Sequence, residues 1–222
     1  MRLAVIPARG GSKRIPRKNI VEIGGKPMIV HVLETARRSG LFDHIHVSTD
    51  DAEIAAIAAA AGYPPDFPRD PGLADDHTPL MPVLQAVAAR YPGCDTICML
   101  MATAILVEPD DLIAAHQVFL SHQGRRPVLA VADFPCPVEW AFRLHADHSL
   151  EEIQPGMGNV RSQDLPKAYY DSGTFYFYPA AVIEDPKSAP AYLAHPIPRW
   201  KAVDIDGPED LEMADRLFRG RL

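Results

Sequence analysis

The chain has 222 residues, of which 47% are hydrophobic and 23% are charged, so it can bury a sizeable core in one domain. Its formal net charge of -7 argues against nucleic-acid or membrane binding, because either would favour a basic face on the whole domain. The longest apolar stretch, residues 96–107, is too short to span a bilayer, and no secretory signal pattern precedes it. We therefore expect a soluble, cytoplasmic protein with a single domain over residues 1–222.

The first predicted element is a strand over Leu3–Ile6, which leads into a loop that is unusually rich in basic residues. The basic residues of this loop are Arg9, Lys13, Arg14, Arg17 and Lys18. Gly10 and Gly11 allow the backbone to approach a ligand and to direct N–H groups toward it. The spacing fits neither a Walker loop nor a dinucleotide-binding loop. The loop therefore predicts a triphosphate or pyrophosphate site, with Arg9 and Lys13 as anion contacts.

Strands and helices alternate through the next part of the chain. The pattern predicts a helix over 27–40, a strand over 44–47, a helix over 52–61, a proline-rich loop over 63–78 and a helix over 79–91. It then predicts a buried strand over 96–101, a helix over 110–122 and a buried strand over 128–132. This order predicts an α/β fold, a Rossmann-like three-layer sandwich with a mostly parallel sheet, in which ligands bind over the carboxyl ends of the strands.

The alternation fails over residues 134–168, where we expect an excursion from the sheet with a two-stranded stretch over 140–144 and 151–153. Apolar residues in this excursion, around Trp140 and Phe142, need a cover and favour a dimerisation element; packing back on its own domain is the alternative. The last predicted elements are strands over 174–178 and 201–205 and a closing helix over 208–219.

Two carboxylates stand near the end of the chain. Asp204 and Asp206 are two positions apart in the predicted strand over 201–205, so they share a face, with alpha carbons about 6.6 Å apart at ~3.3 Å per residue. Hard oxygen ligands beside substrate phosphates are typical of a Mg²⁺ site. The alternative is that Asp206 caps the closing helix, which begins with Pro208.

Four tracts together resemble the acylneuraminate cytidylyltransferases, and within them most closely the pseudaminic acid cytidylyltransferases. The tracts are IPARGGSKRIPRKN near the start, VSTDDAEIA at Val47–Ala55, RSQDLPKAYYDSGTFYF at Arg161–Phe177 and VDIDGPEDLEMA near the end. The resemblance extends over nearly the whole chain. It implies a nucleotidyltransferase on a Rossmann-like sheet that joins CTP to an acidic nine-carbon sugar, uses Mg²⁺, releases pyrophosphate and forms a homodimer through the inserted segment.

The resemblance also implies roles for single residues. Arg9 and Lys18 match triphosphate-binding residues, Asp204 and Asp206 match metal-binding residues, and these four are the expected catalytic set. From the loop and the resemblance together, the expected nucleotide-binding residues are Ala8, Arg9, Gly10, Gly11, Ser12, Lys13, Lys18, Arg69, Asp76 and Thr78. The expected sugar-binding residues are Thr103, Arg161, Gln163, Tyr170, Ser172 and Gly173.

Two departures from the sialic acid enzymes bear on the sugar. Met101–Ile105 stands where those enzymes have a Gln-Pro-Thr-Ser-Pro run, and Tyr170 replaces a sugar-facing arginine. These departures are compatible with a differently decorated nonulosonic acid, and we expect pseudaminic acid. N-acetylneuraminic, legionaminic and 3-deoxy-octulosonic acids are the alternative acceptors.

The expected reaction is an in-line attack of the anomeric hydroxyl of the sugar on the α-phosphorus of CTP, in which positioning and electrostatics provide the catalysis. Other classes of function remain open: a noncatalytic nucleotide or pyrophosphate sensor, or an RNA-binding module. A sensor does not require paired carboxylates, and an RNA-binding module would favour basic residues and stacking aromatic side chains over a broader surface.

Overall fold

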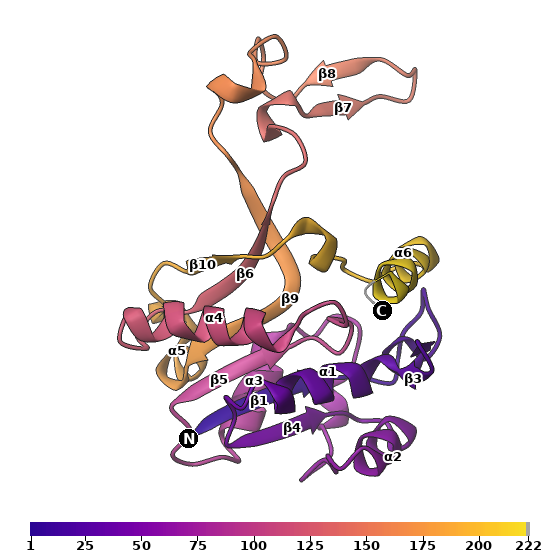
Figure 1. Ribbon diagram of the computed structural model, residues 1–222, viewed down its shortest axis with the longest axis vertical. Coiled ribbons are helices and arrows are strands. Elements are labelled where there is room, and N and C mark those ends of the chain that lie inside the picture. The colour runs from indigo at the N-terminus through magenta and orange to yellow at the C-terminus, as the bar shows by residue number, and fades with distance from the viewer. Residues whose placement is uncertain (221–222) are drawn as a thin grey trace.

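A six-stranded sheet forms the centre of the computed structural model, which describes residues 1–220 (Figure 1). Its order is β10-β6-β9-β5-β1-β4. The strands are β1 (Arg2–Pro7), β4 (His44–Ser48), β5 (Thr96–Leu100), β6 (Val128–Asp133), β9 (Tyr169–Pro179) and β10 (Leu193–Pro196). β1 is parallel to β4 and β5, and β10 is parallel to β6, whereas β9 runs antiparallel to β5 and β6. The mostly parallel sheet is therefore confirmed.

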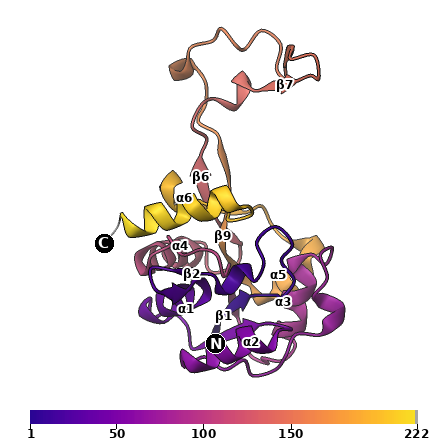
Figure 2. The same cartoon turned by 90° about the vertical axis from the view of Figure 1, so that its right-hand side faces the viewer.

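Helices cover both faces of this sheet, which confirms the three-layer sandwich (Figures 1 and 2). One buried cluster packs the first face against α1 (Met28–Arg38), α2 (Ala52–Ala60), α4 (Pro109–Ser121) and α6 (Pro208–Arg219). The other face packs against α3 (Leu80–Ala88) and α5 (Ala180–Glu184). α1 has an apolar stripe that includes Ile29 and Leu33, both fully buried. Within residues 1–220, no helix has the length and apolar character needed to cross a bilayer.

Residues 134–168, which we call the arm, project away from the sheet between β6 and β9 (Figures 1 and 2). The arm contains the hairpin of β7 (Phe142–Leu144) and β8 (Leu150–Glu152). Several of its apolar side chains are exposed, with Leu144 at 70% and Leu150 at 62% of full exposure, whereas Trp140 is partly buried. A second small hairpin, β2 (Glu22–Ile23) with β3 (Lys26–Pro27), lies between the basic loop and α1.

The predicted strand over 201–205 is wrong. Arg199–Lys201 forms a 3-10 turn, and residues 202–206 have no regular secondary structure. The Lys201 ammonium group is held by Glu108 at 2.5 Å and Asp111 at 2.7 Å, which fixes the turn against the start of α4. The place beside β6 is instead taken by β10, whose His195 and Pro196 do not fit an apolar strand pattern. The short helix α5 was not predicted either.

Candidate active site

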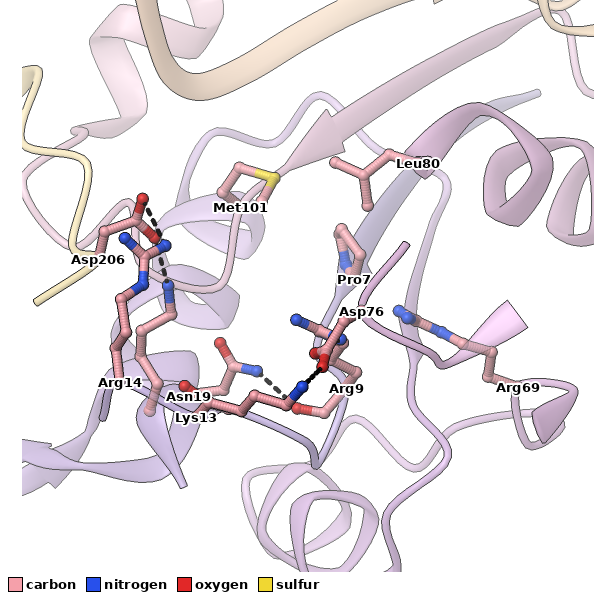
Figure 3. Close-up of a pocket in the computed structure, with 12 residues that line it drawn as sticks. Pro7, Arg9, Lys13, Arg14, Asn19, Arg69, Asp76, Leu80, Met101 and Asp206 are labelled. Atoms are coloured by element: carbon pink, nitrogen blue, oxygen red, sulfur yellow. Dashed lines mark hydrogen bonds and ion pairs between the residues drawn. The ribbon is translucent and has the colours of Figure 1, made fainter. Parts of the chain in front are cut away.

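A cavity of about 450 Å³ opens beside the carboxyl ends of β1 and β5 (Figure 3). The basic loop supplies most of its polar lining, and the remainder comes from the loop after α2, the start of α3, the turn after β5 and the segment before α6. The lining residues are Pro7, Arg9, Ser12, Lys13, Arg14, Lys18, Asn19, Arg69, Asp76, Leu80, Met101 and Asp206. Six residues of the expected nucleotide-binding set are among them, as is one of the two expected metal ligands.

Asp76 lies between two cations of the basic loop. Arg9 donates to its carboxylate at 2.6 Å, and Lys13 forms an ion pair with the other carboxylate oxygen (Figure 3). Hydrogen bonds from Lys13 and then Arg9 lower the pKa of Asp76. The buried side chain of Asn19 fixes the loop by donating to the carbonyl of Arg9 at 3.0 Å. Two cations therefore converge here on one anion, which in this chain is the carboxylate of Asp76.

Asp206 is the partner of two further cations. Lys18 donates to the carbonyl of Ile205 at 2.6 Å and lies 3.3 Å from the Asp206 carboxylate, and Arg14 lies 2.9 Å from it. Burial alone would raise the pKa of Asp206, but the hydrogen bond and charge of Lys18, with those of Arg14, hold it below its usual value. Asp206 is not the cap of α6, because Asp210 accepts from the backbone N–H groups of Asp206 and Gly207.

Asp204 lies beside Gly173 of β9. A Cβ built on Gly173 would lie 3.4 Å from Cγ of Asp204, so the strand backbone and this carboxyl group are in close approach. Partial burial raises the pKa of Asp204, and the charge of Asp206 raises it further. The charged form of Asp204 is therefore disfavoured, and a cation beside the two carboxylates would relieve this.

These two aspartates carry the type of ligand atom that Mg²⁺ takes, a carboxylate oxygen. Among the side chains of residues 1–220, no group of three or more His, Cys, Asp and Glu is arranged to hold a metal ion. Mg²⁺ keeps several waters, however, and binds through one or two carboxylates together with substrate phosphates. Asp204 and Asp206 could supply such oxygen atoms. They would do so from an irregular segment and not from one face of a strand as predicted, and the charge of Asp206 acts on Asp204.

The basic loop is anchored to the start of α2. Arg17 has a left-handed backbone with φ 59°, and its guanidinium donates to Asp51 at 2.5 and 2.9 Å. Asp51 also caps α2 by accepting from the N–H groups of Glu53 and Ile54. Gly10 packs over Asp51, and its own N–H group donates to Asp50 at 3.1 Å. Arg17 therefore belongs to the framework of the loop, whereas Arg9, Lys13 and Lys18 face the cavity.

Arg69, which is buried, lies in the loop after α2 and lines one wall of the cavity. Its guanidinium donates to the hydroxyl of Ser48 at 3.1 Å and to the carbonyl of Ser48 at 2.7 Å. Burial lowers the pKa of this guanidinium. Thr78 lies just before α3, where its N–H donates to Asp75. Arg69 thus joins the end of β4 to the loop that carries Asp76.

None of the six expected sugar-binding residues is among those that line the cavity. Arg161 pairs with Asp164 at 2.8 Å in the arm, and Gln163 lies in the same 3-10 turn. Tyr170 packs its ring against Phe134, with 5.2 Å between centroids. In this single chain, these three residues lie apart from the residues that line the cavity.

Two hydroxyl residues of the expected sugar set are buried. Thr103 lies in the turn after β5, and Ser172 donates to the carbonyl of Ala130 at 2.8 Å.

Five residues that line the cavity had no separate predicted role: Pro7, Arg14, Asn19, Leu80 and Met101. The basic cluster of the sequence already contained Arg14, but no local signal indicates its pairing with Asp206, which lies far along the chain.

Known proteins match the chain along most of its length. A family model described as cytidylyltransferase matches residues 3–173. A pseudaminic acid cytidylyltransferase of Campylobacter jejuni is 39% identical, covering 98% of this chain and 96% of its own length. An N-acylneuraminate cytidylyltransferase B of Danio rerio is 32% identical, covering 97% of this chain and 51% of its own length.

A solved structure of CMP:2-keto-3-deoxy-manno-octonic acid synthetase complexed with CTP has a TM-score of 0.75 to this chain. It covers 100% of this chain and 99% of its own chain, at 20% sequence identity. At this identity the likeness shows the fold alone, and the fold is the one that the order of elements predicts.

Proposed function

Because this chain belongs to the cytidylyltransferase family, we propose that it transfers CMP from CTP to the anomeric hydroxyl of an acidic nonulosonic sugar and releases pyrophosphate. The relative at 39% identity favours pseudaminic acid as the acceptor. The departures at Met101–Ile105 and Tyr170 agree with this choice.

The observation that supports this function best is the cavity that Arg9, Lys13 and Lys18 line together with Asp206. A triphosphate needs several cations on its leaving phosphates, and in-line transfer also develops charge near the attacked phosphorus. Arg9 and Lys13 would bind the β- and γ-phosphates once these displace Asp76. Lys18, fixed by the carbonyl of Ile205, would hold a charge near the α-phosphate.

Asp204 and Asp206 would hold Mg²⁺, which would supply further neutralisation of phosphate charge. Ser12 and the backbone N–H of Gly11 would bind phosphate oxygens. The N–H groups of Ala8 and Gly10 already donate to Ser48 at 2.9 Å and to Asp50 at 3.1 Å, so these two residues would shape the loop instead. The reaction requires no covalent intermediate with the protein, because positioning and charge stabilisation suffice for a direct displacement.

The loop after α2 would bind the nucleoside. Arg69 fixes this loop to the end of β4. Asp76 lines the cavity, and Thr78 lies two positions after Asp76, just before α3. The sugar would enter from the β9 side, where Thr103, Ser172 and Gly173 shape the edge of the sheet.

The remaining sugar-binding candidates bear on the oligomeric state. Arg161, Gln163 and Tyr170 would reach a sugar only through a rearrangement of the arm or through a second copy of the chain. We therefore propose a homodimer formed through the arm.

Pyrophosphate release tests the function. The protein, CTP and Mg²⁺ are incubated with a panel of pseudaminic, N-acetylneuraminic, legionaminic and 3-deoxy-octulosonic acids, and released pyrophosphate is measured. We expect the fastest release with pseudaminic acid and CTP, and little with ATP, GTP or UTP. Faster release with another acid would reassign the acceptor. CTP binding without release for any acid would support the sensor alternative instead.

A further inference from the structure

A wide irregularity in β9 shapes the β9 side of the candidate site. Leu129 of β6 lies opposite Tyr176, and Val131 lies opposite Asp171, so a step of five positions along β9 matches a step of two along β6. Bulges of this kind bend a strand and redirect its side chains, and they are frequent next to active sites.

Buried hydrogen bonds fix this bulge. The hydroxyl of Ser172 donates to the carbonyl of Ala130 at 2.8 Å and accepts from the hydroxyl of Thr174 at 2.7 Å. Gly173 has a φ of +65°, a conformation that residues with side chains rarely adopt. The hydroxyl groups inside the bulge are therefore paired, and they hold its shape. Ser172 acts as part of this framework.

The bulge brings Asp171 and Tyr176 together although they are five positions apart. The Tyr176 hydroxyl lies 2.9 and 2.8 Å from the two oxygens of the Asp171 carboxylate, to which it donates. The N–H of Gly173 donates to the same carboxylate at 2.9 Å. Burial, followed by the hydrogen bond to Asp171, raises the pKa of Tyr176, so this phenol remains a donor. Asp171 is thus an exposed carboxylate with a fixed orientation.

The same bulge touches the candidate site at two points. Met101, which lines the cavity, donates its N–H to the carbonyl of Thr174 at 2.8 Å. Gly173 lies against Asp204, because a Cβ on this glycine would be 3.4 Å from Cγ of the aspartate. Since β9 is antiparallel to β5, Asp171 lies beyond the carboxyl end of β5, the end that Met101 follows into the cavity lining, although Asp171 itself is not a lining residue.

We propose that Asp171 binds the acceptor sugar by accepting hydrogen bonds from its hydroxyl or amide N–H groups. This inference rests on the proposed function, since it assigns a contact to the acceptor of that reaction. An ionised carboxylate only accepts hydrogen bonds, and Tyr176 and Gly173 leave some of its lone pairs free. It repels phosphates and the carboxylate of the sugar, so neutral donor groups of the sugar are its matching partners.

This assignment makes Asp171 a specificity residue. A site built to hydrogen-bond particular donors strongly rejects a substrate that lacks them, because the polar group of the site is left unpaired. Tyr176 is a positioning residue, since it acts on the sugar through the carboxylate it orients.

The test separates sugar binding from CTP binding. The KM of each substrate is measured for the wild type and for Asp171→Asn, Asp171→Ala and Tyr176→Phe, and CTP binding is measured by calorimetry without sugar. In Asp171→Ala we expect about a tenfold or larger rise in the KM of the sugar, and less than about a twofold change for CTP. Tyr176→Phe should give a smaller rise in the same direction. Asp185→Asn, which changes an exposed carboxylate after α5, serves as the matched control.

Three results would overturn the proposal: an unchanged KM of the sugar in Asp171→Ala, equal losses for sugar and CTP, or a fall in kcat alone. If Asp171→Ala unfolds, the isosteric Asp171→Asn is judged by the same criteria, because it keeps a hydrogen-bond acceptor for Tyr176. If the wild type releases no pyrophosphate with any acidic sugar, the proposed function fails. If the wild type is active and the Asp171 variants have the same KM for the sugar, only the inference about Asp171 fails and the proposed function is retained.

Discussion

Arg9 and Asp76 are 67 positions apart in the chain, yet the guanidinium donates to the carboxylate at 2.6 Å inside the candidate active site. Lys13 contacts the other oxygen of the same carboxylate. A carboxylate of the protein is therefore paired with the two cations that we assign to the leaving phosphates of CTP. Binding of the triphosphate has to exchange this pair for phosphate oxygens.

The first prediction follows from this exchange. In Asp76→Asn, the cations of Arg9 and Lys13 lose their internal competitor, so inorganic pyrophosphate should bind about two- to fivefold more tightly in calorimetry at low salt. CTP should gain less, because Asp76 also belongs to the expected nucleoside-binding segment. Asp75→Asn is the matched control, since Asp75 accepts from its own turn at His77 and Thr78. Unchanged or weaker pyrophosphate binding in Asp76→Asn would contradict the exchange.

The second prediction compares the two glycines of the basic loop. A Cβ on Gly10 would lie 2.5 Å from a carboxylate oxygen and 2.9 Å from Cβ of Asp51, whereas a Cβ on Gly11 would meet no heavy atom within 4 Å. Gly10→Ala should therefore push Asp51 away from Arg17 and lower the free energy of unfolding by about 1–3 kcal/mol, with Gly11→Ala close to wild type. Urea titration measures both. Equal stability of the two variants would show that Asp51 moves without cost.

Local patterns predicted the elements that bury a regular apolar face, such as α1 and β5. The segment over 201–205 has the same alternation as a strand but forms none, because the edge position beside β6 belongs to β10 and Lys201 is held by the start of α4. Pairing partners of this kind are tertiary facts that a single sequence does not contain.

The candidate site shows the same division. Gly10 and the basic residues around it were visible in the sequence, since the glycine pair and the charge cluster are local signals. The contact of Asp171 with Tyr176 depends on a bulge that is set by pairing with β6, and no periodicity indicates it. Arg17 also belongs to the local charge cluster, but its partner, Asp51, lies at the start of α2 and could not be read from the loop itself.

The third prediction concerns the metal. Asp204→Asn should abolish Mg²⁺-dependent turnover and the increase in melting temperature that Mg²⁺ and CTP together give the wild type. The metal-free variant should be at least as stable as the wild type, because burial and the charge of Asp206 raise the pKa of Asp204 and disfavour its charged form. Asp215→Asn, which changes an aspartate on α6 paired with Arg219, is the control. Full activity of Asp204→Asn would remove the metal assignment.

The fourth prediction concerns acid stability. His46 is only 1% exposed, its ring nitrogens have no hydrogen-bond partner among the described residues, and burial lowers its pKa to about 4. Asp66 lies 4.0 Å away and Phe67 stacks on the ring. The unfolded chain binds this proton near pH 6.5. The contribution of neutral His46 to the free energy of unfolding is therefore fully present above that pH and is lost as the pH falls toward 4. His46 alone should lower the free energy of unfolding by about 2 kcal/mol at pH 5 relative to pH 8.

Urea titrations at several pH values measure this effect. His46→Leu should have a flatter dependence between pH 8 and pH 5, because leucine fills the site without a titrating group. His195 also has a pKa lowered by burial, so His46→Leu should retain part of the slope. An identical slope in the variant and the wild type would show that His46 is not the main acid-sensitive group.

The fifth prediction concerns the arm. Leu144 and Leu150 lie opposite each other in the pairing of β7 with β8, and both are mostly exposed. An isolated two-stranded hairpin is marginally stable in water, so an apolar hairpin that leaves the sheet needs a surface to cover it. A second copy of the arm would provide such a surface. The double variant Leu144→Lys and Leu150→Lys should therefore be a monomer in gel filtration with light scattering, at concentrations where the wild type is a dimer.

Leu120→Lys is the matched control, because Leu120 is 57% exposed on α4 and lies outside the arm. It should remain a dimer if the arm forms the interface, since adding one charge elsewhere on the surface does not affect the arm. A wild type that stays monomeric at both low and high concentration would contradict the dimer. A double variant that stays dimeric would show that the interface lies away from β7 and β8. The exposed leucines of the arm would then have to be covered by something other than a second copy of the arm, because an apolar face is costly to leave in water.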